Sequence, residues 1–500
     1  MNSRSRAHSF KSDRNIITEV KSVNQSLIFE LGSAEKSGVD VQDCDFSANL
    51  IGDSFRKEKI GLPGLSEPEV IRHFVNLSKK NYSIDEGIYP LGSCTMKHNP
   101  RLNEKLARLE GFANLHPLQP INTVQGILEL MFELSKNLLE ITGMDAVALS
   151  PAAGAQGELC GILAIKQAFE KKGDNRSKIL VPDSAHGTNP STAALCGYDI
   201  ESIPSNSEGR INFEILKEKL NSQVAALMLT NPNTCGLFEN DILKIAEEVH
   251  NVGAYLYCDG ANFNAIVGKV KPSSLGIDAM HLNLHKTFST PHGGGGPGSG
   301  PVVVSSRLSS YLPIPMVKMV NNKFEIIEKE SIDSFGRLKA FHGQVGTFIR
   351  AYAYILSHGA DGLKQVAEDA VLNANYIQSK LKKYLTVRYS GYCMHEVLFD
   401  DKFLKGTEVS TLDFAKAMID KGIHPMTIYF PLIVSGAMLT EPTETESKKD
   451  LDDFCEKLID LAEEAKSGNK NLFDSSPTKA VLGRLNETAA AKDLVLTYSE

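Results

Sequence analysis

A lysine directly after a strand-like segment is the first residue in this sequence whose position suggests chemistry. The apolar stretch 280–284 leads into Lys286, and four glycines follow at 293–296. A lysine that leaves a buried strand is easily desolvated, which favours its neutral, nucleophilic amine. Glycines let a ligand or a neighbouring backbone approach closely. Taken alone, Lys286 fits a solvated surface lysine before a flexible loop better, because most lysines are exposed.

Two further polar side chains follow apolar runs. Asp259 ends the run 254–258, and a carboxylate at the carboxyl end of a parallel strand faces the crevice where α/β sheets bind ligands. Such a carboxylate can pair with a protonated pyridine nitrogen and hold the ring as an electron sink. His186 follows the run 178–181, where its imidazole could lie over a planar ring. A hydrogen-bonded loop histidine explains His186 equally well.

A turn of small residues, 151–158, joins the apolar run 147–149 to a helical pattern. Small residues at a strand-to-helix turn expose backbone N–H groups at the positive end of the helix, where phosphate binds. The turn matches neither G-x-G-x-x-G nor the Walker pattern, so dinucleotide and nucleoside-triphosphate sites lose support. The residues predicted to hold the phosphate are Ala153, Gly154, Ala155 and Gln156.

From about residue 145, short apolar runs alternate with helical stretches. This alternation predicts βαβ units around a buried, mostly parallel sheet. The runs are 146–149, 179–181, 225–229, 254–257 and 302–304, and the helical patterns include 158–171 and 238–250. The order along the chain is phosphate turn, stacking histidine, ring-nitrogen carboxylate and lysine, each at the end of a predicted strand. That order is typical of the large domain of fold-type I pyridoxal-phosphate enzymes, so we predict that α/β fold with a smaller α+β C-terminal domain.

Four segments are expected along the chain. Residues 1–95 are polar, with Pro/Gly signals that suggest an arm and short helices. Residues 96–354 carry the alternating pattern of the large cofactor domain. Residues 355–474 mix helical with strand-like pieces, which predicts the small α+β domain, and 475–500 are expected to form an extended tail.

Composition excludes several classes of protein. With 53 Lys+Arg against 61 Asp+Glu, the net charge of −8 argues against a nucleic-acid binder. No 18 apolar residues run together, so no membrane span is expected. Eight scattered cysteines without a C-x-x-C pair argue against a disulfide scaffold or a metal site and favour a cytoplasmic protein. Residues 1–14 lack a secretory apolar core; a frayed terminus explains their Ser/Arg content better than a transit peptide does.

Several long sequence motifs of this chain are also found in a known protein family. The matching segments are 89–97 (YPLGSCTMK), 115–120 (LHPLQP), 149–158 (LSPAAGAQGE), 183–190 (DSAHGTNP), 259–262 (DGAN), the lysine segment 281–297, 441–448 (EPTETESK) and 484–487 (RLNE). The chain resembles the P-protein of the glycine cleavage system, and more narrowly subunit 2 (β) of its two-subunit form. Small departures occur at Gln344, Val345 and His98, outside the predicted cofactor shell.

The resemblance implies a pyridoxal-phosphate-dependent oxidoreductase that decarboxylates glycine and releases CO2. It passes the aminomethyl group to the lipoyl arm of the H-protein. Lys286 would hold the cofactor covalently, Asp259 would keep the ring nitrogen protonated, and His186 would stack on the ring. Ala261 and, more weakly, Thr234 would contact the cofactor. His285 and His292 would either move protons or serve the structure.

The resemblance also implies partners and a lipoyl channel. The channel is expected to be lined by Tyr89, Ser93, Cys94, Lys97 and His116. Cys94 is either a redox thiol or, more simply, an inert one. A separate α subunit (subunit 1) would complete an α2β2 heterotetramer, because single-chain P-proteins are much longer. No arginine can be assigned to the substrate carboxylate among Arg72, Arg337 and Arg350.

Two other functions remain compatible with these residues. The same cofactor shell would serve another fold-type I enzyme, such as an aminotransferase or an amino-acid decarboxylase without a carrier. A non-catalytic assembly subunit that kept the fold is the other alternative, although retention of Lys286, Asp259 and His186 argues against it.

Overall fold

A computed structural model describes residues 26–33, 35–39, 42, 52–54, 56, 58, 60–293, 298–328 and 333–496. The predictions for residues 1–14 and for the glycines at 294–296 lie outside the described residues. The chain divides into two compact units, Met1–Glu86 with Ser475–Glu500 and Gly87–Asp474, and each is described by itself. The domain boundaries expected from the sequence at 95, 354 and 474 stay predictions.

The smaller unit consists of short helical pieces. They are α1 (Ile28–Leu31), a 3-10 turn at Gly52–Ser54, α2 (Glu67–Ser78) and α15 (Glu487–Lys492). Helix α2 begins where the Glu69 carboxylate accepts hydrogen bonds from the backbone N–H of Ser66 at 2.9 Å and from its hydroxyl at 2.8 Å. The negative charge of a carboxylate in the first turn is also stabilised by the positive N-terminal end of the helix dipole.

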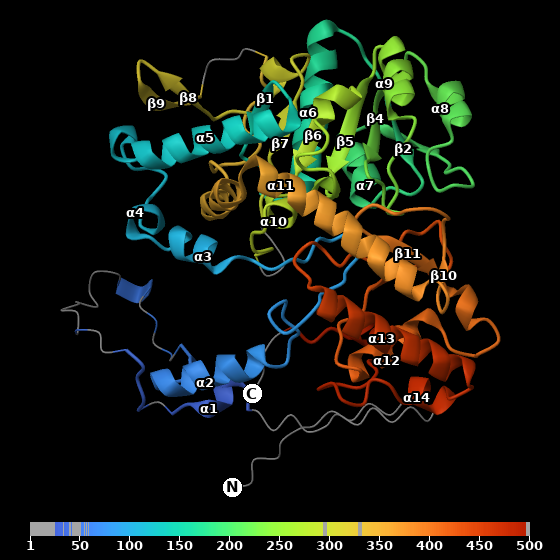
Figure 1. The fold of residues 1–500 in the computed structure, drawn as a ribbon. Coiled ribbons are helices and arrows are strands. Elements are labelled where there is room, and N and C mark those ends of the chain that lie inside the picture. Colours follow the sequence, from blue (N-terminus) through green and yellow to red (C-terminus); the bar gives the residue numbers. More distant parts are fainter. Residues whose placement is uncertain are drawn as a thin grey trace. The chain divides into compact units, whose positions relative to one another are not determined.

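The larger unit is built on a seven-stranded sheet (Figure 1). Its strands are β1 (Ala146–Ala148), β2 (Lys178–Pro182), β3 (Asp199–Ile203), β4 (Val224–Thr230), β5 (Tyr255–Gly260), β6 (Ala279–Leu282) and β7 (Val302–Val304). The strand order is β1-β7-β6-β5-β4-β2-β3. Strands β2 to β6 are parallel, and β7 runs antiparallel to both β6 and β1. The predicted mostly parallel sheet is therefore confirmed.

Both faces of this sheet are buried. Successive side chains of a strand point to opposite sides of the sheet, and in the central strands both sets of side chains pack into apolar clusters. In β4, Leu227 and Leu229 pack in one apolar cluster, whereas Ala226 and Met228 pack in another. The same alternation places Leu256 on the first side and Tyr257 on the second. The central strands therefore read as continuous apolar runs rather than as alternating patterns.

Helices cover the sheet and connect it to the rest of this unit (Figure 1). They are α3 (Arg101–Ala107), α4 (Glu110–Ala113), α5 (Gln125–Thr142), α6 (Gly154–Lys172), α7 (Thr188–Leu195), α8 (Phe213–Lys219), α9 (Ile242–Asn251), α10 (Leu284–Thr287) and α11 (Val345–Leu381). Helix α11 changes direction at Gly359, whose φ of 63° is non-helical. It packs against α3 and α5 near one end and against α13 (Lys448–Lys466) near the other. None of the described helices is long and apolar enough to cross a membrane.

A second, antiparallel sheet follows α11. Its strands are β10 (Thr386–Val387), β11 (Val397–Asp400), β12 (Thr427–Ile428) and β13 (Met438–Thr440), in the order β10-β11-β13-β12. Helices α12 (Thr411–Asp420), α13 and α14 (Lys470–Ser475) accompany it, with a separate apolar core. A hairpin of β8 (Met316–Val320) and β9 (Lys323–Ile327) lies earlier in the chain.

The segment around residue 92 ties the start of the larger unit to this second sheet. Leu91 forms an isolated β-bridge with Thr440, and the backbone N–H of Gly92 donates to the carbonyl of Leu439 at 3.2 Å. The Thr427 hydroxyl donates to the carbonyl of Gly92 at 2.9 Å. A Cβ atom at position 92 would lie only 2.6 Å from the Leu439 carbonyl oxygen. A glycine is therefore required for this close approach.

Replacing Gly92 with Ala should lower the free energy of unfolding by about 1–3 kcal/mol, because the backbone of Leu439 must move. Urea unfolding of the two proteins measures the difference. Gly111→Ala is the matched control, since a Cβ there meets nothing within 4 Å. Equal stability of Gly92→Ala and wild type would contradict the close packing.

Candidate active site

A cavity of about 140 Å³ lies where several strands of the large sheet end. Parallel strands bring the residues that follow them to one edge of the sheet, where α/β proteins bind ligands. Eight residues that the sequence singled out line it: Ser93, Gly154, Ala155, His186, Thr234, Asp259, Ala261 and Lys286. Six others line it as well: Glu158, Thr188, Thr230, Asn262, His281 and Asn283.

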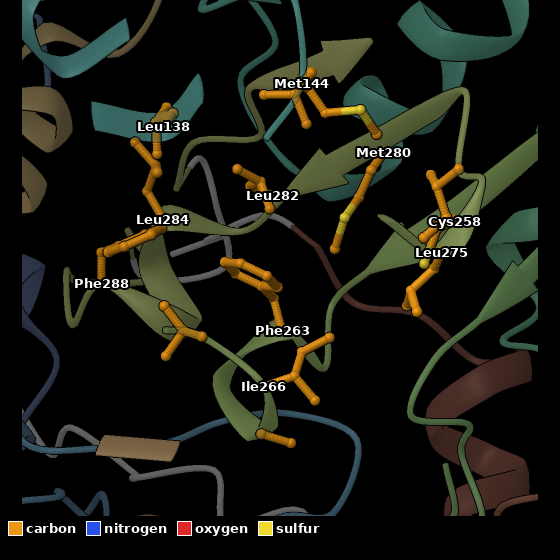
Figure 2. Close-up of a cluster of buried hydrophobic side chains, with 14 of the residues drawn as sticks. Leu138, Met144, Cys258, Phe263, Ile266, Leu275, Met280, Leu282, Leu284 and Phe288 are labelled. Carbon is orange, nitrogen blue, oxygen red and sulfur yellow. The ribbon is translucent and has the colours of Figure 1, made fainter. Parts of the chain in front are cut away.

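Lys286 lies in the single helical turn α10, because β6 already ends at Leu282. Leu284 and Phe288 flank it, are fully buried, and belong to the same apolar cluster as Phe263 (Figure 2). These two anchors fix the turn on which the lysine stands. The Lys286 side chain reaches the cavity with only 9% of the residue exposed, and Nζ donates to the Ser93 carbonyl at 3.0 Å.

Asp259 is held by three groups at the end of β5. Its Oδ1 lies 3.2 Å from His281 Nε2 and accepts from the Ala261 backbone N–H at 2.9 Å. Its Oδ2 accepts from Asn189 Nδ2 at 3.0 Å. Burial opposes the charge of this carboxylate, but His281 and the two N–H donors hold the pKa of Asp259 below its usual range. Asp259 is therefore an anion at neutral pH.

His281 is the main residue that the sequence analysis missed at this end of the sheet. It lies within β6 directly beside β5, in register with Asp259. Its Nδ1 is 2.8 Å from the hydroxyl of Tyr257, so the ring is held from both sides. A histidine in an apolar strand is the signal that could have found it, because a buried imidazole needs polar partners.

His186 follows β2 and belongs to a short hydrogen-bonded chain. Its Nδ1 lies 3.0 Å from the hydroxyl of Thr188, which donates to Glu158 Oε1 at 2.7 Å. Its ring packs edge-on against Phe430, with centroids 5.7 Å apart. Burial and the nearby Asp259 charge raise the pKa of Glu158 to about 7. Glu158, read from the sequence only as the end of a motif, is thus an ionisable group of the cavity.

The predicted phosphate turn forms the N-terminus of α6. Gly154 and Ala155 line the cavity, whereas Gln156 turns back and accepts from the Ala152 backbone N–H at 2.7 Å. The first N–H groups of a helix have no partner within the helix. A Cβ at Gly154 would come within 2.8 Å of Asn283 Nδ2. Ala153, just before the helix, does not line the cavity. Its carbonyl packs so closely against Gly300 that a Cβ atom at position 300 would clash with it.

Several buried polar atoms of the cavity have no hydrogen-bond partner within the part of the chain that the structure describes. They are Thr230 Oγ1, Asn262 Oδ1 and Asn283 Oδ1. The Thr234 hydroxyl, in contrast, donates to the carbonyl of Ser184. Unpartnered polar atoms, a helix N-terminus and an anionic Asp259 together fit a planar, phosphorylated ring compound with a basic nitrogen.

The residues predicted to line a lipoyl channel lie in different surroundings. Ser93 borders the cavity, and Cys94 Sγ lies 3.8 Å from His292 Nε2. Tyr89 stacks on His424 with ring centroids 4.1 Å apart. His116 is exposed, and its Nδ1 accepts from the Leu118 N–H at 3.1 Å. The channel stays a prediction.

Lys97 is buried and its ammonium is fully engaged. It contacts Glu444 Oε1 at 2.6 Å, Asn264 Oδ1 at 2.8 Å, the Thr287 carbonyl at 2.8 Å and the Tyr354 hydroxyl at 3.3 Å. Burial lowers the pKa of Lys97, and the adjacent Glu444 carboxylate opposes that shift. The ion pair therefore joins the segment before α3 to the segment after β13 and to the end of α10.

The two histidines beside the lysine turn are neutral at physiological pH. Burial and nearby positive charge lower the pKa of His285 to about 3 and that of His292 to about 4. Their rings meet edge to face at 4.9 Å. Of the arginines considered for a substrate carboxylate, Arg337 pairs with Glu328 and Arg350 with Glu104, both at 2.7 Å.

Replacing Lys97 with Met should lower the free energy of unfolding by about 3–5 kcal/mol, because the buried Glu444 charge loses its partner. Chemical denaturation measures the loss. Lys136→Met, which breaks an exposed ion pair with Glu133, is the control and should change stability little. A Lys97→Met protein as stable as that control would contradict the assigned ion pair.

Comparisons with known proteins agree with this fold. Two family models match: the C-terminal domain of glycine dehydrogenase over residues 366–481 and aminotransferase class-V over residues 156–296. A crystal structure of glycine decarboxylase (P-protein) of the glycine cleavage system superposes with a TM-score of 0.69 at 19% identity. The match covers 83% of this chain and 93% of that one. The predicted fold-type I architecture is thereby confirmed.

Sequence relatives are much closer. "Probable glycine dehydrogenase (decarboxylating) subunit 2" of Caulobacter vibrioides is 59% identical over 477 residues, which cover 94% of this chain and 91% of the relative. The protein of the same name from Thermotoga maritima is 51% identical over 94% of this chain and 99% of its own length. The chain therefore belongs to the family of glycine dehydrogenase (decarboxylating) subunit 2 proteins.

Proposed function

We propose that this protein binds pyridoxal 5'-phosphate in the cavity at Lys286 and decarboxylates glycine as the catalytic subunit of a glycine dehydrogenase. The aminomethyl group would pass to the lipoyl arm of the H-protein. The observation that carries the proposal is the meeting of Lys286, the anionic Asp259 and the start of α6 in one cavity. The names of the sequence relatives support the choice of glycine.

Pyridoxal phosphate, when bound, supplies an electron sink that takes up the electron pair left on the α-carbon as CO2 departs. The chain's own contribution begins with Lys286, whose amine would hold the cofactor. The rigid α10 turn holds that amine at the cavity wall. The Ser93 carbonyl is the acceptor for the Lys286 N–H.

Asp259 would hold a proton on the ring nitrogen. Its own position is fixed by His281 and Asn189, and the hydroxyl of Tyr257 fixes His281 in turn. An anion buried beside the ring nitrogen favours the protonated ring, and only a protonated ring draws electrons strongly. The group Asp259–His281–Tyr257 is thus expected to act as one unit.

The phosphate would lie against the N–H groups of Gly154 and Ala155 at the start of α6. Gln156 would support the turn through its bond to Ala152 rather than touch the phosphate. Ala153 would contribute backbone, Ala261 would border the ring, and Thr234 would contribute a polar edge. His186 would lie over the ring, steadied by Thr188 and Glu158.

Transfer to the lipoyl arm requires a carrier and a partner subunit. In such a transfer the carbon that loses CO2 would form a bond to one lipoyl sulfur, the sulfur–sulfur bond would break, and the second sulfur would take up a proton. The phrase "subunit 2" in the relatives' names supports a separate subunit 1, which we propose completes an α2β2 assembly in the cytoplasm. The proposed lipoyl channel would still be lined by Tyr89, Ser93, Cys94, Lys97 and His116. The ion pair of Lys97 with Glu444 would hold this segment of the chain in position.

Substituting Lys286 with Ala should abolish the exchange of labelled bicarbonate into glycine, because the attachment amine is lost. The assay uses this chain co-purified with subunit 1 and supplied with lipoylated H-protein and pyridoxal phosphate. Lys269→Ala, at an exposed ion pair with Glu368, serves as the control and should retain full exchange. Exchange at the wild-type rate in Lys286→Ala would refute the proposed role. Exchange by wild type without H-protein would instead indicate a carrier-independent decarboxylase.

Substituting Asp259 with Asn should leave cofactor binding measurable but reduce exchange by about 100-fold or more, because a neutral amide cannot hold the ring nitrogen's proton. The cofactor's visible absorption measures binding, and the bicarbonate assay measures turnover. Near-normal turnover with cofactor bound would remove Asp259 from this role.

A further inference from the structure

A second group of buried ionisable side chains lies behind Lys286, outside the cavity. His395 and Glu396 immediately precede β11, and Glu441 immediately follows β13. Because β11 and β13 pair with Val397 opposite Thr440, these side chains meet at one end of the small sheet. All three residues are 0% exposed. Nothing in the proposed reaction uses them.

Each carboxyl group has one bonded oxygen and one unpartnered oxygen. Glu396 Oε2 accepts from the Ser93 backbone N–H at 2.6 Å, and Glu441 Oε1 accepts from the Thr95 hydroxyl at 2.5 Å. Four atoms have no hydrogen-bond partner among the described residues: Glu396 Oε1, Glu441 Oε2 and both ring nitrogens of His395. Atoms from the three side chains lie within 4.8 Å of one another. His395 Nε2 is 4.0 Å from Glu396 Oε1 and 3.9 Å from Glu441 Oε2.

Two fully buried carboxyl groups whose atoms lie within 4.8 Å strongly disfavour a charge on both, because their repulsion adds to the cost of burial. Among the described residues, no lysine or arginine forms an ion pair with either one. Burial raises the pKa of Glu441 to about 7 and raises that of Glu396 well above its usual range. Burial lowers the pKa of His395 to about 3, so the imidazole adds no positive charge.

Ser93 connects this group to the lysine. Its backbone N–H donates to Glu396 Oε2, and its carbonyl accepts from Lys286 Nζ at 3.0 Å. The backbone of Ser93 therefore donates a hydrogen bond to the Glu396 carboxyl group and accepts one from the Lys286 amine. Ser93 adopts a φ of 63°, which non-glycine residues adopt only when surrounding contacts hold them there. The two buried acids, through Ser93 and Thr95, provide such contacts.

We propose that Glu396 and Glu441 share one proton and carry a single negative charge between them, which balances the Lys286 ammonium through the Ser93 peptide. Both acids are positioning residues, because they act on the lysine through Ser93 and Thr95 and do not line the cavity. The proposal goes beyond the proposed function and rests on the geometry of the acids, whatever substrate the cavity takes.

Other charges around the pair are accounted for. Lys286 and Lys97 are the cations that act on it, and Glu444, the ion-pair partner of Lys97, is the next acid. The thiol of Cys94 faces the same region, but burial raises its pKa, so it stays uncharged at neutral pH. The pair's charge is therefore set mainly by its two acids and Lys286.

Infrared spectroscopy of the full-length chain tests the shared proton directly. A protonated carboxyl group has a C=O stretching band that a carboxylate lacks, and its disappearance with rising pH gives a midpoint. Because the pKa of Glu158 is also raised to about 7, the band of the acid pair is read as the wild-type spectrum minus that of Glu396→Gln/Glu441→Gln, and we expect this difference band at neutral pH. In each single variant the remaining acid should titrate at least about one pH unit lower, because its repulsive partner is gone. Glu456→Gln, at an exposed position, is the control and should leave the band unchanged.

The link to the lysine has its own variant, which keeps both acids intact. In Lys286→Met the midpoint should rise, because the nearby positive charge is lost. An unchanged midpoint would overturn the proposed balance with Lys286. Midpoints in the single variants equal to wild type would overturn the shared proton. A stoichiometric divalent metal in the purified protein, lost in Glu441→Gln, would show a metal site and would also overturn it.

Thermal unfolding gives a second readout that needs no spectral assignment. A carboxyl whose pKa is raised in the folded state costs stability as pH rises from its unfolded value through its folded value. The wild-type melting temperature, measured relative to that of Glu441→Gln, should therefore fall between about pH 4.5 and 7. A difference that stays constant over this range would contradict a protonated Glu441 in the native protein.

Discussion

Holding an amine away from water, where it can still react, is the constraint on which the rest of this structure depends. Lys286 is almost fully buried, and its nitrogen has the Ser93 carbonyl as an acceptor. Acids compensate for its charge on two sides: Asp259 borders the same cavity, and the pair Glu396–Glu441 lies behind Ser93. An isolated buried charge would otherwise be costly to the folded state.

The sheet satisfies this constraint by bringing distant parts of the chain to one edge. Strands β2, β4, β5 and β6 run parallel, so the residues after each of them gather at their common end. The α10 turn is fixed by the burial of Leu284 and Phe288, and the start of α6 is packed against Asn283 and the chain near Gly300. The ion pair of Lys97 and Glu444 then holds the Ser93 segment in place.

Much of the sheet and part of the site could be predicted from the sequence, because both depend on local patterns. Apolar runs with abrupt ends mark β4 and β5, and Asp259 stands out because it ends the second run, whereas Thr234 and Ala261 come from the family resemblance. The edge strand β3 carries Asp199 and Glu201 among its five residues and escaped detection, because its exposed pattern does not read as a buried run. Lys286 does follow β6, although the strand ends two residues earlier than expected, at Leu282 instead of Leu284.

Long-range polar contacts could not be predicted. Ser93 and Glu396 are 303 positions apart in the chain, and Lys97 and Glu444 are 347 apart. No local pattern records that such residues meet. His281 lies inside an apolar strand, and its pairing with Asp259 depends on the register of β5 and β6. These contacts depend on tertiary structure, so only the fold itself reveals them.

Borohydride reduction followed by peptide mass mapping tests the central claim most directly. The protein is incubated with pyridoxal phosphate, reduced, digested, and searched for a peptide that carries the added cofactor mass. The account predicts a single modified residue, Lys286, at close to one equivalent per chain, because its amine alone combines burial with access to the cavity among the lysines of the described residues. Stoichiometric labelling of another lysine, or no labelling at Lys286, would contradict it.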